Sequence, residues 1–144
     1  MRLHRESRQL PYTCDQLFAL VLDIERYPEF VPGYRHTRIL RREAAALMVE
    51  QRVGFGPASI TFHSRAEFAA PERIFVRASD GPFRRLEVEW CFAAEGAACR
   101  VTAETRYQLD GLWAPMLSGW LTLAATRLLD AFAQRATEVY GAGA

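Results

Sequence analysis

The stretch that decides the fold runs from Leu112-Trp113-Ala114-Pro115-Met116 to Glu138-Val139-Tyr140-Gly141. Proline is tolerated in the first turn of a helix and glycine is favoured just past its end, so Pro115 and Gly141 bracket one long helix. From Pro115 to Tyr140 such a helix is about 39 Å long at 1.5 Å per residue. We expect the rest of the chain to be organised around it.

The two halves of this helix differ in their apolar pattern. In the second half the apolar residues recur every three or four positions and form one stripe: Leu121, Ala124, Ala125, Leu128, Phe132, Ala136 and Val139. In the first half Met116, Trp120 and Leu123 fall on the side that is polar further along. This end is therefore expected either to be covered by a loop of the same domain or to face a cavity mouth, a membrane or a partner.

Length and composition bound the class of protein. The 144 residues are expected to form a single domain over 1–144, large enough to bury about two thirds of its unfolded surface. Charges nearly balance, with 18 basic and 17 acidic residues, so nothing demands a nucleic-acid partner. The basic cluster at Arg35, His36, Arg38, Arg41 and Arg42 is either a solvated edge strand or a phosphate-binding patch.

Cysteine usage and hydropathy indicate the compartment. Cys14, Cys91 and Cys99 show no CxxC spacing, and no signal or transit peptide precedes them, so we interpret them as reduced thiols of a cytosolic protein. Cys91 and Cys99 could face each other across a hairpin. No apolar run approaches the ~18 residues that span a bilayer, so any membrane contact is expected at the surface.

The first third of the chain predicts an edge strand and two short helices. Residues 2–10 form the strand candidate, and Thr13 with Gln16 forms a capping box before a helix of about ten residues. Pro28 and Pro32 prevent a continuous helix, which leaves a short helical turn. An apolar knuckle follows: Tyr27, Phe30, Val31 and Tyr34.

From Arg35 onward the apolar residues alternate with polar ones, which predicts strands with one wet face. The predicted strands are 35–42, 47–55, 59–69, 73–79, 83–92 and 99–109. Consecutive hairpins make an antiparallel meander, whose twist curls it around the final helix. The expected fold class is α+β, a curved antiparallel sheet wrapped around the long C-terminal helix, with an apolar hollow where the two diverge.

Four stretches carry a family resemblance, in order and over nearly the whole chain: 17–32, Ser64-Arg65, Gly81-Pro82-Phe83 with Leu86 and Trp90, and 131–141. They resemble the coenzyme Q-binding START-domain family, which includes the RatA-type ribosome-association proteins and belongs to the polyketide cyclase-like (SRPBCC) superfamily. The resemblance implies a helix-grip (START/Bet v 1-like) fold with the order β-α-α-β6-α. Members usually carry Trp-Cys where Gly33-Tyr34 stand here, so the entrance is expected to be shaped differently.

The resemblance also implies three functions. The first is a non-enzymatic carrier of a hydrophobic ligand, foremost ubiquinone (coenzyme Q) and otherwise another isoprenoid or lipid, that supports respiratory electron transport. The second is a toxin that binds the large ribosomal subunit and blocks subunit association, with residues 35–42 contacting ribosomal RNA. The third is a cyclase- or dehydratase-like enzyme. The expected location is the cytoplasm, peripheral to the inner membrane; the oligomeric state is left open.

The residues themselves favour binding over catalysis. His4, His36 and His63 lie near the terminus or on the polar side of strands, and no metal-binding spacing occurs, so we predict no catalytic residue, metal or catalytic cofactor. Ser64 and Arg65 either anchor a polar head group or bond across the sheet. Burying a ligand tail is worth about 0.8 kcal/mol per CH₂, so an apolar tunnel would suffice for affinity.

The predicted ligand-binding residues are Phe30, Val31, Tyr34, Phe62, Phe83, Leu86, Trp90, Met116 and Trp120. For Phe62, Phe83 and Trp90 the alternative is ordinary packing in the core. The residues expected at the entrance or at a transiently contacted membrane surface are Tyr27, Pro32 and Trp113.

Overall fold

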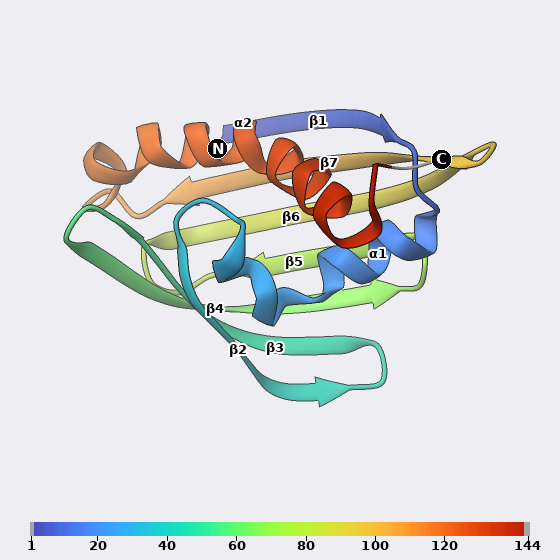
Figure 1. Cartoon of the computed structure of the whole chain (residues 1–144). Coiled ribbons are helices and arrows are strands. Elements are labelled where there is room, and N and C mark those ends of the chain that lie inside the picture. The colour runs from blue at the N-terminus through green and yellow to red at the C-terminus, as the bar shows by residue number, and fades with distance from the viewer. Residues whose placement is uncertain (1, 143–144) are drawn as a thin grey trace.

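A computed structural model describes residues 2–142 (Figure 1). The strands are β1 (Arg2–Leu10), β2 (Tyr34–Glu43), β3 (Ala46–Phe55), β4 (Ala58–Ala69), β5 (Arg73–Ala78), β6 (Phe83–Glu95) and β7 (Ala98–Leu109). The helices are α1 (Cys14–Leu22), the 3-10 helix η1 (Ile24–Glu29) and α2 (Ala114–Tyr140). This order confirms the predicted α+β helix-grip class.

All neighbouring strands in the sheet are antiparallel, in the order β1-β7-β6-β5-β4-β3-β2. β1 and β2 are therefore the two edge strands. The largest boundary difference from the predicted strands is at β6, which continues to Glu95 because the ladder with β7 runs on to the Glu95–Ala98 pair. Figure 1 shows α2 crossing the concave side of the sheet, with α1 beside its C-terminal end.

Local signals fix the start of α1 and the end of α2. The hydroxyl of Thr13 accepts a hydrogen bond from the backbone N–H of Gln16. The side-chain oxygen of Gln16 accepts one from the backbone N–H of Thr13, so the predicted capping box is present. Gly141 follows α2 with a φ of +86°, a conformation that favours glycine. Both ends therefore form as the sequence predicts.

The second half of α2 is fastened to the core. Phe132 is only 3% exposed, and its ring centroid lies 5.0 Å from those of Phe30 and Trp90. The guanidinium of Arg135 pairs with Glu29 at 3.0 Å, and Arg8 pairs with Asp130. This half thus joins the sheet, η1 and β1 through apolar and ionic contacts.

The inward stripe of α2 ends differently from the prediction. Val139 was expected in the stripe but is 50% exposed, so that assignment is wrong. The buried positions in this half are Leu129, Phe132 and Ala136. The next residue on the same face of the helix is Tyr140, in the last turn. The Tyr140 hydroxyl donates to the carbonyl of Gln16 at 2.9 Å, which ties the helix end to α1.

The first half of α2 is held on one side only. Leu117 is 1% exposed and anchors it, whereas Met116 and Leu123 are 58% and 49% exposed. A covering loop, one of the expected arrangements, is therefore wrong for these two residues. The segment 111–126 carries no charged residue. Within residues 2–142, no helix has the length and hydrophobicity needed to cross a bilayer.

The cysteines pair differently from the suggested hairpin contact. Cys91 lies opposite Thr102, on the outer face, so it does not face Cys99. Cys99 points inward and its sulfur lies 2.7 Å from that of Cys14, which donates a thiol hydrogen bond to it. Burial is the main cause that raises the pKa of Cys99 to about 12. Both thiols therefore belong to the packing between α1 and β7.

Candidate functional site

An apolar cavity of about 90 Å³ lies between the concave face of the sheet and the middle of α2. Its walls are Val31, Pro32, Tyr34, Val53, Phe62, Leu86, Val88, Thr105, Tyr107, Trp120, Leu121, Ala124, Ala125 and Leu128. The polar groups on these walls are side-chain hydroxyls and the indole N–H of Trp120. The arrangement can bury an apolar group and bring a polar group of the same ligand near the hydroxyls of Tyr34, Thr105 and Tyr107.

Strand alternation and two small helix residues create this space. Every second residue of β3, β4, β6 and β7 points inward, which brings Val53 and Phe62 to the same wall. Opposite them, α2 presents Ala124 and Ala125. Because alanine side chains are short, the helix leaves a gap where larger residues would interdigitate with the sheet.

The structure brings about half of the predicted ligand-binding and entrance residues to this cavity. They are Val31, Pro32, Tyr34, Phe62, Leu86 and Trp120. Phe83 packs on the ring of Phe62 with centroids 5.0 Å apart, outside the cavity lining. Met116 points to solvent and Trp113 is half-buried beside Leu117.

Three further predicted residues surround Phe132 rather than the cavity. Trp90 and Phe30 contact its ring, and Tyr27 lies 5.3 Å from it by centroids. The hydroxyl of Tyr27 donates to the carbonyl of Val21, which fixes the ring. The expectation that Tyr27 stands at an entrance does not match this packed position, because the aromatic cluster encloses it.

Sequence reasoning missed the other lining residues: Val53, Val88, Thr105, Tyr107, Leu121, Ala124, Ala125 and Leu128. The available signal was the inward phase of the strands for the first four and the apolar stripe of the helix for the last four. The predicted ligand-binding residues were mainly aromatic, whereas small and β-branched residues make up much of the cavity wall.

Gly33 lies directly against the ring of Trp120. A Cβ atom at Gly33 would lie 2.5 Å from Cζ2 of Trp120, and Gly33 has a φ of +86°. The indole therefore packs directly on backbone that only glycine leaves bare. Through this contact the loop after η1 positions one wall of the cavity.

Two tyrosine hydroxyls, those of Tyr34 and Tyr107, belong to residues that line the cavity. Burial raises the pKa of Tyr34 to about 12, so its phenol remains protonated. The Tyr107 hydroxyl lies 3.2 Å from that of Thr122 on α2, which links β7 to the helix. Among the described residues that line the cavity, none is a carboxylate, a histidine or a basic side chain.

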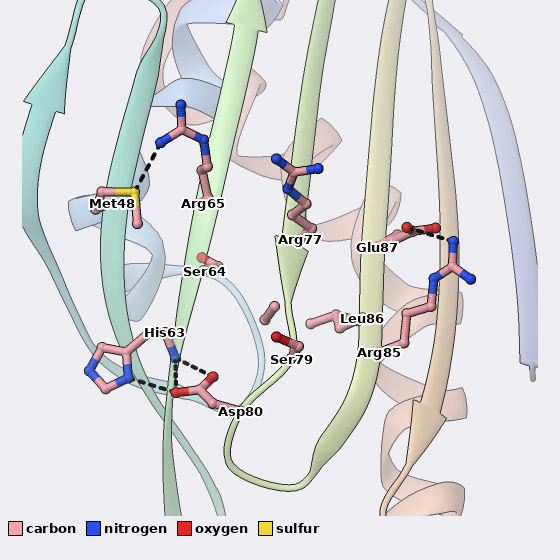
Figure 2. A pocket seen from close by; sticks show the side chains of 11 residues that line it. Met48, His63, Ser64, Arg65, Arg77, Ser79, Asp80, Arg85, Leu86 and Glu87 are labelled. Atoms are coloured by element: carbon pink, nitrogen blue, oxygen red, sulfur yellow. Dashed lines mark hydrogen bonds and ion pairs between the residues drawn. The ribbon is translucent and has the colours of Figure 1, made fainter.

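A second depression, of about 410 Å³ and bordered by charged side chains, lies on the outer face of the sheet (Figure 2). It forms where β4 and β5 separate, beyond the Arg65–Arg77 pair. Its cations are held by carboxylates: Arg65 pairs with Glu43 at 2.9 Å, and Arg77 pairs with Glu67 at 2.8 Å. Mutual neutralisation makes this depression a weak candidate for binding a charged ligand.

His63, at the rim of the outer depression, is held between two acids. Its Nδ1 lies 2.8 Å from Asp80 and its Nε2 lies 3.2 Å from Glu50, as Figure 2 shows for Asp80. The hydrogen bond with Asp80 is the main cause that raises the pKa of His63 above 6.5. Both ring nitrogens are engaged, so His63 has a structural role at the surface.

We expect the free energy of unfolding to fall as the pH rises through the raised pKa of His63. The imidazolium stabilises the folded state fully below the unfolded pKa of about 6.5, and this contribution is lost above the folded pKa. Because the ring is exposed, the effect should stay below about 1 kcal/mol. Urea unfolding between about pH 6 and pH 9 measures it. The substitution His63→Gln should reduce the dependence of the unfolding free energy on pH, and His36→Gln should not. An unchanged pH dependence in His63→Gln would contradict the stabilising role of the His63 imidazolium.

Metal binding finds no support in the described part of the chain. No group of three or more His, Cys, Asp or Glu side chains within residues 2–142 is placed to hold an ion.

Known proteins share this fold and much of this sequence. A family model described as polyketide cyclase, dehydrase and lipid transport matches residues 10–135. The ribosome association toxin RatA of Pseudomonas aeruginosa is 34% identical, covering 95% of this chain and 96% of its own. The mitochondrial coenzyme Q-binding protein COQ10 of Dictyostelium discoideum is 24% identical, covering 94% of this chain and 69% of its own.

Two solved structures place the same architecture in different contexts. The 18 kDa protein CC1736 of Caulobacter crescentus is 35% identical with a TM-score of 0.75, covering 99% of this chain and 100% of that one. The Zhui aromatase/cyclase of Streptomyces sp. R1128 has a TM-score of 0.77 at 17% identity, covering 99% of both chains. The second likeness concerns the fold alone.

Proposed function

The chain belongs to the polyketide cyclase, dehydrase and lipid transport family, and within it to the RatA-type group. We propose that it binds a ubiquinone-type isoprenoid. The observation that carries the proposal is the apolar cavity between the sheet and α2. Its hydroxyls suit an oxygen-bearing ring, and its apolar walls suit a hydrocarbon tail. The similarity to a coenzyme Q-binding protein supports the same ligand class.

Binding a long tail requires the cavity to widen. Its volume of about 90 Å³ is below the ~300–1,000 Å³ that is usual for ligand sites. The element best placed to move is the first half of α2, because Leu117 is its buried anchor while Met116 and Leu123 face solvent. We therefore propose that the ligand lifts this half of the helix away from the sheet.

The same exposed residues suit exchange of the ligand with a membrane. Leu112 is 86% exposed and continues the uncharged surface of Met116 and Leu123. Apolar side chains of this kind can enter the headgroup region of a bilayer. Contact with the inner membrane from the cytoplasmic side is thus part of the proposal.

Organic extraction of the purified protein, followed by mass spectrometry, tests the binding proposal. We expect a quinone or another isoprenoid to be recovered. Ala124→Leu, which fills the cavity, should lower the recovered amount several-fold, whereas Thr126→Leu on the exposed side of α2 should not. Recovery of no lipid, or equal recovery from both variants, would refute binding in this cavity.

Binding rather than catalysis is proposed because the cavity offers no acid-base pair among the described residues. The fold alone does not decide the matter, since an aromatase/cyclase shares it.

A second function, association with the large ribosomal subunit, is favoured by the 34% identity to a RatA protein. The arginine-rich edge strand β2 would supply the contact, but most of its arginines have partners. Arg35 donates to Ser59 at 2.9 Å, and Arg42 lies 3.8 Å from Glu25. Arg38 is exposed, with no carboxylate partner among residues 2–142, so it is the best placed to meet a phosphate.

Sedimentation with isolated ribosomal subunits tests this second function. Binding should weaken steeply as salt rises, because phosphate contacts release counterions. Arg38→Glu should reduce co-sedimentation with the large subunit several-fold, whereas Arg127→Glu on α2 should leave it unchanged. Failure of the wild-type protein to sediment with either subunit would exclude this function.

A further inference from the structure

An incompletely bonded polar pair, Gln51 and Ser64, is buried on the concave face of the sheet. Gln51 is 4% exposed and Ser64 is 3% exposed. Nε2 of Gln51 donates to the hydroxyl of Ser64 at 2.5 Å. The other amide atom, Oε1 of Gln51, is fully buried and has no hydrogen-bond partner among the described residues. Buried polar atoms almost always have a partner, so this acceptor needs an explanation.

Neither side chain lines the apolar cavity; the pair lies one inward position further along β3 and β4 than Val53 and Phe62, and Ser64 also borders the outer depression. Gln51 precedes Val53 by two residues on β3, and Ser64 follows Phe62 by two residues on β4, so all four point inward. Gln51 is also the register partner of Phe62. Because Val53 and Phe62 line the cavity, a ligand group that passes these two side chains meets the amide next.

The neighbouring buried polar residue does not share this feature. Thr37, on β2, donates its hydroxyl to the carbonyl of Ile24 at 2.8 Å. That bond joins the sheet to η1 and accounts for the side chain. Gln51 has no corresponding bond for its oxygen, which points to a missing donor rather than to a role in folding.

We propose that Gln51, held by Ser64, is the polar anchor for the head group of the ligand. As it stands, Oε1 accepts a hydrogen bond from a hydroxyl on that head group. With the amide turned over, Nε2 donates to a ring carbonyl while the Ser64 hydroxyl donates to Oε1. The pair thus suits both a quinone and a quinol. The head group enters first, and the tail extends toward the exposed end of α2.

This inference rests on the proposed binding function, and the substitution Gln51→Leu tests it separately. Leucine has a similar size; it removes the unpartnered acceptor and also the hydrogen bond to Ser64, so these two effects oppose each other and the stability of the variant should change little. Both proteins are titrated with a short-tailed ubiquinone and with a hydrocarbon of the same tail length. We expect the affinity for ubiquinone to fall about tenfold, the equivalent of one hydrogen bond, while the affinity for the hydrocarbon changes less than twofold.

Two further variants keep the result interpretable. Ser64→Ala releases the amide and should weaken ubiquinone binding several-fold with the same selectivity. Thr37→Val should lower stability without changing the preference between the two probes.

Equal ubiquinone affinity in wild-type and Gln51→Leu proteins would overturn the anchor and leave the binding function intact. Equal loss of both probes in Gln51→Leu, together with lower stability, would overturn it in favour of a folding role. Absence of binding of either probe to the wild-type protein would overturn the binding function and the anchor together.

Discussion

Replacing Phe132 with alanine is expected to lower the free energy of unfolding by about 3–5 kcal/mol. The ring is 3% exposed and meets Phe30, Trp90 and Tyr27 edge-on, at centroid distances of 5.0 to 5.3 Å. Truncation would leave a cavity between η1, the sheet and α2 that these rigid rings cannot fill. Urea denaturation followed by circular dichroism measures the loss.

Phe75 provides the matched control on the opposite face of the sheet. It is half-buried, and its main contact is the guanidinium of Arg73, 5.5 Å from the ring centroid. Phe75→Ala should therefore cost about 1 kcal/mol or less. Similar losses for the two substitutions would contradict the position of Phe132 at the centre of the core.

Replacing Gly33 with alanine is expected to lower the free energy of unfolding by about 2–5 kcal/mol. The left-handed backbone, with φ of +86°, costs a residue with a Cβ about 1–2 kcal/mol. The methyl group would also stand 2.5 Å from the Trp120 ring, and overpacking of this kind costs about 1–3 kcal/mol. The ring must move, so the indole N–H resonance of Trp120 should shift and ligand binding should change.

Gly119→Ala is the control on the same helix. A Cβ there would have no atom within 4 Å, and alanine is the better helix former by up to about 1 kcal/mol. This variant should be slightly more stable than the wild-type protein, with the Trp120 resonance in place. A Gly33→Ala variant of wild-type stability and unshifted Trp120 would show that the loop does not position the ring.

Periodicity explains why the fold could be predicted. Inward and outward residues alternate along β4 from Ile60 to Phe68, and Pro115 and Gly141 bracket α2. These signals are local, because a strand or helix displays its own period in the sequence. Hairpin connections then fix the order of β2 to β7, whereas the pairing of β1 with β7 joins distant segments of the chain.

The candidate site could be predicted only in part, because it depends on contacts between distant segments. Nothing in the sequence near Gly33 indicates that Trp120 will lie on it, and nothing near Gln51 indicates that Ser64 will leave its oxygen unpaired. The cavity exists because Ala124 and Ala125 are too small to fill the space. A sequence shows where the aromatic residues are, but it does not show where small side chains will leave a space in the folded protein.

The two halves of α2 are attached to the rest of the domain by different contacts. Ionic and aromatic contacts near Asp130, Phe132 and Arg135 carry the folding energy of the helix. The uncharged segment 111–126 contributes less and borders the cavity. The exposed positions of that half, such as Met116 and Leu123, can therefore be substituted with little loss of folding energy, whereas Leu117 and Trp120 cannot.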